Sequence, residues 1–344
     1  MVEPPRALLQ AYERLRSAGV PALAVAAANR DGRRMAFAEG VRAIGQSARV
    51  TTSDKWHLGS IGKSMTATLV ARLVEQGAIS WDDTIGTVLG AAVPDMRDEY
   101  RDVNLRHLLS HRGGLQPNID EAVGEAFPRE SADPRADRVA YSRLGLLQEP
   151  AGPKERRAIY SNTGYVVVGA MLEAKLGAPW ETLIHDHVFV PLGMTSAGQG
   201  APGTPGLYDQ PVGHAVGASG ALESSPPGSA VVDNVAALGP AGRVHASLDD
   251  VLKHLNAHCS RDASFLRPES WDMLHTPPFG GAYAMGWWRG GQKFRHNGSN
   301  GRWYAEVLFD RSSDSMVVAA MNDGRRDVRN RFGNVIRSAA DAVG

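Results

Sequence analysis

Two residue types that can perform acyl transfer together lie three positions apart in the first fifth of the chain. Ser60 can act as a hydroxyl nucleophile, and Lys63 can take its proton if the pKa of the ammonium group is depressed. Residues at this spacing share one face of a helix. The following residues have helical apolar spacing, so we expect Ser60 at a helix N-terminus, where backbone N–H groups favour negative charge. The apolar stripe consists of Ile61, Met65, Leu69, Leu73 and Val74 and ends at Gly77.

Serine–lysine pairs at this spacing also arise by chance at solvated helix starts, so the pair alone does not define a site. Only six of the 37 basic residues are lysines, so lysine is not the usual surface charge of this chain. The segment that carries Lys63 is also apolar around it. Both observations favour a Lys63 side chain that points into the protein.

The triplet Tyr160-Ser161-Asn162 is the second group of interest, because it follows a Pro/Gly-containing loop and precedes a small, apolar, helix-like segment at 164–172. In a structural interpretation, Tyr160 packs and Asn162 caps the helix. In a functional interpretation, the Tyr160 phenol transfers protons and the Asn162 amide orients a substrate. The residues alone leave both interpretations open.

The third group is His296-Asn297-Gly298, which precedes an aromatic-rich segment at 303–309 that is typical of a strand. Gly298 would let a substrate backbone approach closely, because glycine has no Cβ. Each of the three motifs is weak by itself. Their order and their local contexts together predict one catalytic site.

In these motifs the sequence resembles the serine β-lactamase-like and penicillin-binding-protein-like hydrolases. The branch is the one related to class C β-lactamases, which includes family VIII-type esterases and D-aminopeptidases. That family carries Ser-x-x-Lys, then Tyr-x-Asn, then Lys-x-Gly or a variant such as His-x-Gly. The resemblance implies that Ser60 is the nucleophile, Lys63 its base and Tyr160 a second general acid/base.

The resemblance also implies how a substrate is held. The expected substrate-binding residues are Asn162, His296, Gly298 and Ser299, and the backbone N–H groups of Ser60 and Ser299 are the expected oxyanion hole. Further similar segments lie at 105–111, 113–115, 191–194 and 240–244, so the resemblance covers nearly the whole chain. The chain departs from the family where His296 replaces the lysine of many β-lactamases, which leaves the substrate class open.

Composition limits the classes of partner. The 344 residues carry no net charge and no basic block, so neither nucleic acid nor an anionic membrane is an expected partner. Cys259 is the only cysteine, which rules out an internal disulfide and a cysteine-based zinc site. The first residues lack the pattern of a signal peptide, so a cytoplasmic location is expected, or a periplasmic or secreted one if a leader has been removed.

The order of predicted elements indicates an α/β (α+β) fold with one antiparallel sheet flanked by N- and C-terminal helices, and the resemblance implies that this fold is of the β-lactamase/D,D-peptidase type. We expect a helix around residues 8–15, strands at 22–28, 34–39, 303–309 and 316–321, and a closing helix at 325–343. A mostly helical subdomain at 78–239 would be inserted into an α/β part formed by 1–77 and 240–344, all within one domain. The Pro/Gly-rich stretch 201–229 is predicted to be a long irregular loop.

Other motifs in the sequence do not define a further site. Gly62-Lys63-Ser64 resembles the end of a phosphate-binding loop, but His57 occupies the position that would need glycine. There is no Gly-x-Ser-x-Gly elbow of an α/β-hydrolase. The pairs His107/His111 and His254/His258 have helical spacing but lack the glutamate of a zinc-binding His-Glu-x-x-His motif, so no metal and no cofactor are expected.

The sequence therefore predicts a serine hydrolase that acts on a small molecule through a Ser60 acyl-enzyme. A carboxylesterase-like enzyme for ester or amide bonds is the first expectation, because a neutral histidine holds a substrate carboxylate less well than lysine does. The alternatives are a β-lactamase, a D-alanyl-D-alanine carboxypeptidase or D-aminopeptidase, and a non-catalytic penicillin-binding-like module. The oligomeric state stays open.

Overall fold

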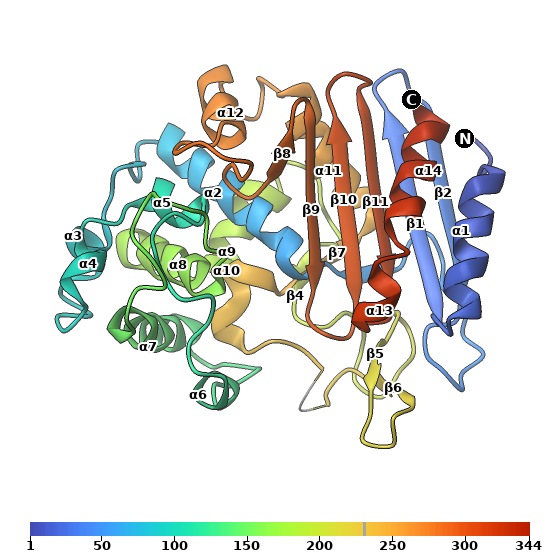
Figure 1. The fold of residues 1–344 in the computed structure, drawn as a ribbon, viewed down its shortest axis with the longest axis horizontal. Coiled ribbons are helices and arrows are strands. Elements are labelled where there is room, and N and C mark those ends of the chain that lie inside the picture. Colours follow the sequence, from blue (N-terminus) through green and yellow to red (C-terminus); the bar gives the residue numbers. More distant parts are fainter. Residues whose placement is uncertain (230–231) are drawn as a thin grey trace.

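A six-stranded antiparallel sheet joins the two ends of the chain (Figure 1). The computed structural model describes residues 1–229 and 232–344. The strand order is β2 (Arg34–Gly40), β1 (Ala22–Asn29), β11 (Ser315–Met321), β10 (Tyr304–Asp310), β9 (Lys293–Ser299) and β8 (Trp288–Gly290). Strands β1 and β11 pair from Leu23 with Met321 to Asn29 with Ser315, and both are buried along their whole length. The predicted sheet built from both termini is therefore confirmed.

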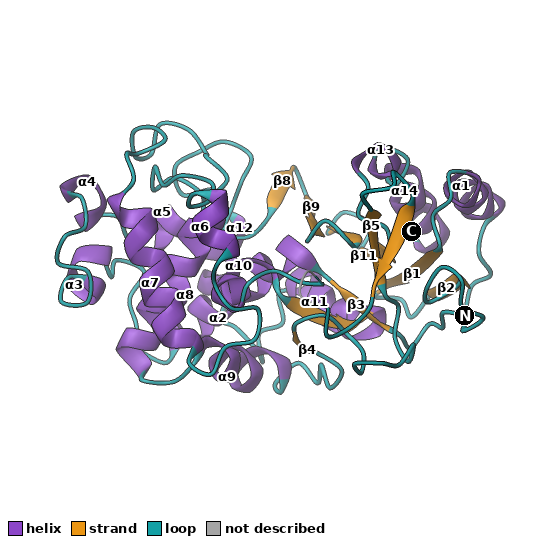
Figure 2. Cartoon of the chain, turned by 90° about the horizontal axis from the view of Figure 1, so that it is seen from below, coloured by secondary structure: helices purple, strands orange, loops and turns teal. Residues whose placement is uncertain are grey.

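Helices cover both faces of this sheet. Helices α1 (Arg6–Ser17) and α14 (Gly333–Val343) lie side by side on one face, and α11 (Leu248–Ser260) packs on the other (Figure 2). The prediction of one closing helix at 325–343 is wrong, because α13 (Arg326–Arg329) ends before a turn and α14 begins after it. Phe332 in that turn is fully buried in the apolar layer beneath α1 and α14, so the chain bends to insert its ring.

A helical region lies beside the sheet and contains the longest helix of the chain. Its core is the pair α7 (Pro134–Leu147) and α8 (Asn162–Leu176). Helix α8 begins where the Ser161 hydroxyl accepts the Gly164 N–H at 2.9 Å, and it ends at Gly177, whose φ of 71° is left-handed. The other helical elements are α3 (Ile85–Leu89), α4 (Asp98–Arg101), α5 (Leu105–Leu109), α6 (Glu121–Glu125), α9 (Trp180–Ile184), η2 (His185–Phe189), η3 (Ala236–Leu238) and α10 (Gly239–Gly242). The exact division of the chain into two parts stays a prediction.

Helix α2 (Gly62–Glu75) runs between the sheet and the helical region, directly after the turn η1 (Gly59–Ile61) that contains Ser60 (Figure 1). It packs against α9, α10, η2 and α12 (Pro268–His275). The helix is buried on nearly all sides, including Lys63, Ser64, Thr66 and Thr68, and not only along the apolar stripe. Its polar side chains therefore need partners inside the protein.

Short strands connect η1 to the rest of the fold. Strand β3 (Lys55–His57) pairs with β7 (Val244–Ser247), which also pairs with β4 (Gly198–Gln199). The predicted loop 201–229 is not wholly irregular, since β5 (Gly213–Val216) and β6 (Leu222–Ser225) form a hairpin within it. Turn residues around Gly220, whose φ is 80°, close this hairpin. Because the same residue types are common in irregular loops, the Pro/Gly-rich composition did not reveal the hairpin. No helix in the described part of the chain has both the length and the apolar character needed to cross a membrane.

Buried histidines link α2, α11 and α12 through hydrogen bonds. The Thr68 hydroxyl donates to the Ser64 carbonyl at 2.8 Å, so His258 Nε2 must donate to Thr68 at 2.9 Å. His258 Nδ1 then accepts from His275 Nε2 at 2.9 Å. Nδ1 of His275 accepts from Arg311 Nη2 at 2.5 Å. This pattern holds both imidazoles in the neutral form.

Acid is therefore expected to destabilise the fold steeply. Burial lowers the pKa values of five histidines below the ordinary value of an imidazole, and these are His111, His254, His258, His275 and His296. Below a pH of about 6.5 these histidines bind protons in the unfolded chain but not in the folded protein. Their contribution to the free energy of unfolding is therefore complete above that pH and decreases as the pH falls. Five such groups imply a loss of roughly 5 kcal/mol between about pH 6.5 and 5.5. Urea unfolding across this range measures the loss.

The variant His254→Gln provides the control for this prediction. It removes one titrating group, so about one proton fewer should be taken up on unfolding in acid. The slope of the free energy of unfolding against pH should be smaller in proportion. A free energy of unfolding that stays constant over the acid range would contradict the prediction.

Candidate active site

Ser60 lies at the entrance to α2, where the chain leaves β3 and turns through η1. The residue before it, Gly59, has a φ of +51°, in the left-handed region that favours glycine. The Ser60 side chain is half-buried, and its Oγ lies 3.0 Å from Nζ of Lys63. The spacing of the two residues thus brings hydroxyl and amine into contact, as the sequence predicted.

Lys63 is completely buried and contacts three oxygen atoms. Besides Ser60 Oγ, Nζ lies 2.7 Å from Asn162 Oδ1 and 2.6 Å from the Ala241 carbonyl. All three partners are uncharged, and burial lowers the pKa of Lys63 well below its ordinary value. A neutral amine would donate to Asn162 and Ala241 and present its lone pair to the Ser60 hydroxyl. The arrangement is that of a general base.

Tyr160 reaches the same hydroxyl from the helical region. Burial raises the pKa of its phenol, although a hydrogen bond with Ser60 opposes the shift. Nζ of Lys63 lies 4.9 Å from the centre of the Tyr160 ring. The phenol therefore stays protonated at neutral pH and can donate a proton. Direct transfer of the Ser60 proton to Lys63 therefore fits these groups better than transfer to a tyrosinate.

Asn162 is the first residue of α8, and both ends of its amide are engaged. Its Oδ1 accepts from Lys63, and its Nδ2 donates to Asn118 Oδ1 at 2.8 Å. Ser161, and not Asn162, caps the helix. The contacts show that Asn162 fixes the Lys63 amine, while its predicted contact with substrate stays a prediction.

His296 lies on β9, and it is buried rather than presented as a surface cation. Its Nδ1 donates to the Asn297 carbonyl at 2.7 Å, and its Nε2 accepts from the Tyr283 hydroxyl at 3.0 Å. Burial lowers the pKa of His296 to about 3, and the nearby Lys63 adds to this. The residue type alone suggests a histidine with an ordinary pKa that is mostly neutral at pH 7. The structure makes it neutral over the whole physiological range.

The strand end after His296 packs directly against the turn that carries Ser60. A Cβ on Gly298 would lie 2.6 Å from Ser60 N, and a Cβ on Gly59 would lie 2.3 Å from Ser299 N. Only glycine allows this approach at either position. The backbone N–H groups of Ser60 and Ser299 are therefore held on adjacent segments, as expected for the two donors of an oxyanion hole.

The sequence did not indicate that two aromatic residues, His111 and Tyr283, contribute to the site. His111 is buried with a φ of +59°, accepts the Ser161 N–H at 3.1 Å through Nδ1, and its ring centre is 4.3 Å from that of Tyr160. It lies in a segment that resembles the family, but it was considered only as a metal ligand. Tyr283, which holds His296, has no distinctive sequence context. Both residues position the catalytic groups.

The histidines at helical spacing contact other side chains of the protein. No group of three or more His, Cys, Asp or Glu side chains within residues 1–229 and 232–344 is arranged to hold a metal ion. His107 Nε2 lies 2.8 Å from a Glu155 carboxylate oxygen, and His254 bonds to Ser64 at 3.1 Å.

The fold and the site agree with comparisons to known proteins. The family model described as Beta-lactamase matches residues 9–340, so the chain belongs to the Beta-lactamase family. Penicillin-binding protein 4 of Amycolatopsis lactamdurans is 26% identical over 319 residues, which cover 86% of this chain and 79% of that protein. Family and site together define a serine hydrolase.

Two solved structures share the fold over nearly their whole length. The D-amino acid amidase from Ochrobactrum anthropi SV3 has a TM-score of 0.76 at 20% identity, covering 98% of both chains. EstCE1, described as a hydrolase with promiscuous acyltransferase activity, has a TM-score of 0.78 at 19% identity, covering 97% of this chain and 98% of its own. At these identities the likeness establishes the fold.

Proposed function

We propose that this protein is a carboxylesterase-like serine hydrolase that cleaves small esters or amides through an acyl-enzyme on Ser60. The observation that carries the proposal is the buried Lys63 amine, 3.0 Å from Ser60 Oγ and surrounded by uncharged partners. An amine in this setting can exist without a proton at neutral pH and activate a serine hydroxyl. No cofactor is part of the proposed reaction.

In the acylation step Lys63 takes the Ser60 proton and Oγ bonds to the substrate carbonyl carbon. The negative charge on the carbonyl oxygen is stabilised by the N–H groups of Ser60 and Ser299, each donor lowering the barrier by roughly 3 kcal/mol. As the tetrahedral intermediate collapses, Tyr160 protonates the departing alcohol or amine, and its proton is replaced from Lys63. A water molecule then attacks the acyl-enzyme and gives one proton to the neutral Lys63 amine. Lys63 passes that proton to Ser60 Oγ as the bond between Oγ and the acyl carbon breaks and the carboxylic acid leaves.

The choice of substrate class rests on His296. Relatives with lysine at this position present a permanent charge to a substrate carboxylate. In this chain the His296 imidazole at that position is buried, forms hydrogen bonds through both ring nitrogens, and is neutral. Neutral esters and small amides do not need such a cation, so they are the proposed substrates. The names of the similar proteins, which include an amidase and a hydrolase with acyltransferase activity, support serine acyl transfer in general.

One observation favours the alternative of a β-lactam or D-peptide substrate. Arg329 Nη2 lies 2.8 Å from Ser299 Oγ, beside the second proposed oxyanion donor, and it also binds the Gly324 carbonyl at 2.6 Å. Both acceptors are neutral oxygens, so the guanidinium could attract a substrate carboxylate. A direct comparison of the two substrate classes decides between them.

We expect wild-type protein to hydrolyse a p-nitrophenyl ester with a kcat/KM at least about tenfold above that for a chromogenic cephalosporin. Because the His296 pKa is about 3, cephalosporin binding should not strengthen as the pH falls from 8 to 5. Steady-state rates with both substrates, measured across this pH range, test the expectation.

Two variants make the comparison specific. His296→Lys should raise the relative rate with the cephalosporin, whereas Arg329→Gln should leave the ester rate unchanged. A wild-type preference for the cephalosporin that Arg329→Gln abolishes would replace the esterase proposal with the lactamase alternative.

A further inference from the structure

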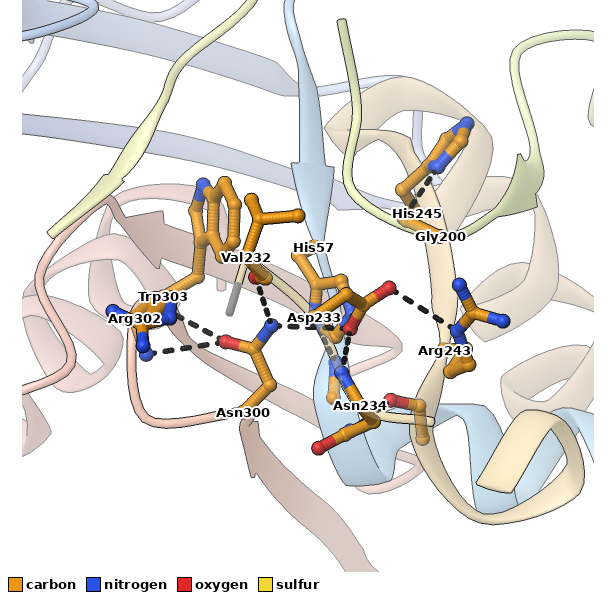
Figure 3. A network of polar contacts seen from close by, with 12 residues as sticks. His57, Gly200, Val232, Asp233, Asn234, Arg243, His245, Asn300, Arg302 and Trp303 are labelled. Carbon is orange, nitrogen blue, oxygen red and sulfur yellow. Dashed lines mark hydrogen bonds and ion pairs between the residues drawn. The ribbon is translucent and has the colours of Figure 1, made fainter. Parts of the chain in front are cut away.

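Asp233 is a buried carboxylate that contacts side chains from three other segments of the chain, those of His57, Arg243 and Asn300 (Figure 3). The Asp233 side chain is 2% exposed. Its Oδ1 lies 2.8 Å from His57 Nε2, 3.2 Å from Asn300 Nδ2 and 2.7 Å from the backbone N of Asn234. Its Oδ2 lies 3.3 Å from Arg243 Nε. The mechanism above uses none of these side chains.

The first connection leads through His57 to the nucleophile. The Gly59 N–H donates to His57 Nδ1 at 3.1 Å, so a neutral ring carries its proton on Nε2, which faces Asp233. Trp303 stacks on the imidazole with ring centres 5.5 Å apart and fixes its plane. Gly59 immediately precedes Ser60. The carboxylate thus orients a ring that holds the backbone on the N-terminal side of the nucleophile.

The second connection leads through Asn300 to the end of β9. Asn300 Nδ2 donates to Asp233, and its Oδ1 accepts the N–H groups of Arg302 at 3.1 Å and Trp303 at 3.3 Å (Figure 3). Asn300 directly follows Ser299, whose N–H is the second proposed oxyanion donor. The same carboxylate oxygen therefore holds both the η1 turn and the β9–β10 turn.

We propose that Asp233 is a positioning residue that sets the spacing of the two oxyanion-hole N–H groups, those of Ser60 and Ser299. The inference rests on the proposed function. Its geometric basis is the narrow gap between the two segments, in which a Cβ on Gly59 would lie only 2.3 Å from Ser299 N. At such close packing, a displacement of either turn changes the distance from donor to oxyanion.

The electrostatics of the network support this assignment. Burial alone would raise the pKa of Asp233, but the neighbouring His57 and Arg243 lower it to about 2. The carboxylate is thus ionised at neutral pH, and charged acceptors make stronger hydrogen bonds than neutral ones. An asparagine at this position has nearly the same shape but would set an amide N–H₂ group against one of the surrounding donors.

The test is Asp233→Asn, assayed with the p-nitrophenyl ester after titrating active sites with a phosphonate. We expect kcat to fall about 100-fold with KM nearly unchanged, because the oxyanion contact forms only in the transition state. A boronic acid, whose tetrahedral Ser60 adduct places an oxygen in the oxyanion hole, should bind more weakly by a similar factor. A purely structural role would lower thermal stability without changing kcat per titrated site.

Asp250→Asn is the matched control. Asp250 is also buried, accepts the Ser196 N–H at 2.6 Å and pairs with Lys253, but it lies on α11 away from Ser60. This variant should lose stability and keep kcat. An unchanged kcat and boronate affinity in Asp233→Asn would overturn the proposal.

If Asp233→Asn does not fold, Asn300→Ser decides the question, since it removes the amide that joins Asp233 to the β9–β10 turn and keeps the Asp233 carboxylate beside His57. A loss of kcat and boronate affinity at constant KM supports the inference, and unchanged values overturn it. Wild-type protein that neither reacts with the phosphonate nor hydrolyses the ester would instead overturn the proposed function, and the inference with it.

Discussion

Replacing Ser60 with alanine is expected to abolish turnover of every substrate, with kcat falling by a factor of at least about 10⁴. The reason is that Oγ is the atom that Lys63 and Tyr160 both contact, so no other group can form the acyl-enzyme. The fold should survive, because Ser60 is half-buried and the change removes one oxygen atom. Initial rates with the p-nitrophenyl ester, together with a thermal unfolding curve, measure both effects.

Ser64→Ala is the matched control for this loss. Ser64 lies one helical turn further along α2, and its hydroxyl donates to the Ile61 carbonyl at 2.8 Å and contacts His254. Removing that hydroxyl should lower stability by about 1 kcal/mol and leave kcat nearly unchanged. Residual ester hydrolysis in Ser60→Ala at the level of Ser64→Ala would show that the nucleophile is elsewhere.

Lys63→Ala and Tyr160→Phe should each slow acylation by roughly 10³-fold, and the double variant should be little slower than either one. The two side chains act on one proton, which leaves Ser60 through the amine and reaches the leaving group through the phenol. Single-turnover rates of acylation separate this step from deacylation. Multiplicative losses in the double variant would mean two independent proton paths.

Lys63→Met separates the chemistry of the amine from its packing. Methionine fills most of the buried space of lysine but cannot accept a proton. We expect Lys63→Met to be as slow as Lys63→Ala while unfolding at a higher temperature. A methionine variant with near wild-type acylation would remove Lys63 from its role as base.

The parts of the site that the sequence predicted are those set by local geometry. Ser60 and Lys63 meet because three residues on a helix bring two side chains together, and this holds whatever surrounds the helix. The strands at both ends of the chain were also predictable, since apolar runs around the turn at Gly32 specify a hairpin. Their union in one antiparallel sheet was predicted, whereas the particular pairing of β1 with β11 was not.

What the sequence did not predict depends on contacts between distant residues. His111, Tyr283 and Asp233 are ordinary residue types in ordinary contexts, and each acquires its role from a partner on another element. The break between α13 and α14 arises because Phe332 is needed in the core, which helical spacing alone does not reveal. The β5–β6 hairpin was hidden because its turn residues also suit an irregular loop.

His296 shows the same limit for electrostatics. Its residue type suggested an ordinary pKa, but burial and the neighbouring Lys63 lower the pKa to about 3. Desolvation depends on the atoms that surround a group in the folded chain, so it cannot be inferred from neighbours in the sequence. The burial of His296 supports the proposed preference for neutral substrates.

The central claim is that Ser60 is the nucleophile, and covalent labelling tests it most directly. Wild-type protein treated with a serine-directed phosphonate, and separately with a penicillin, is analysed by intact mass and then by peptide mapping. We predict one phosphonyl adduct per chain, located on Ser60 and absent from Ser60→Ala, with slower labelling in Lys63→Ala. An adduct on Ser161 or Ser299, or undiminished labelling of Ser60→Ala, would contradict the account.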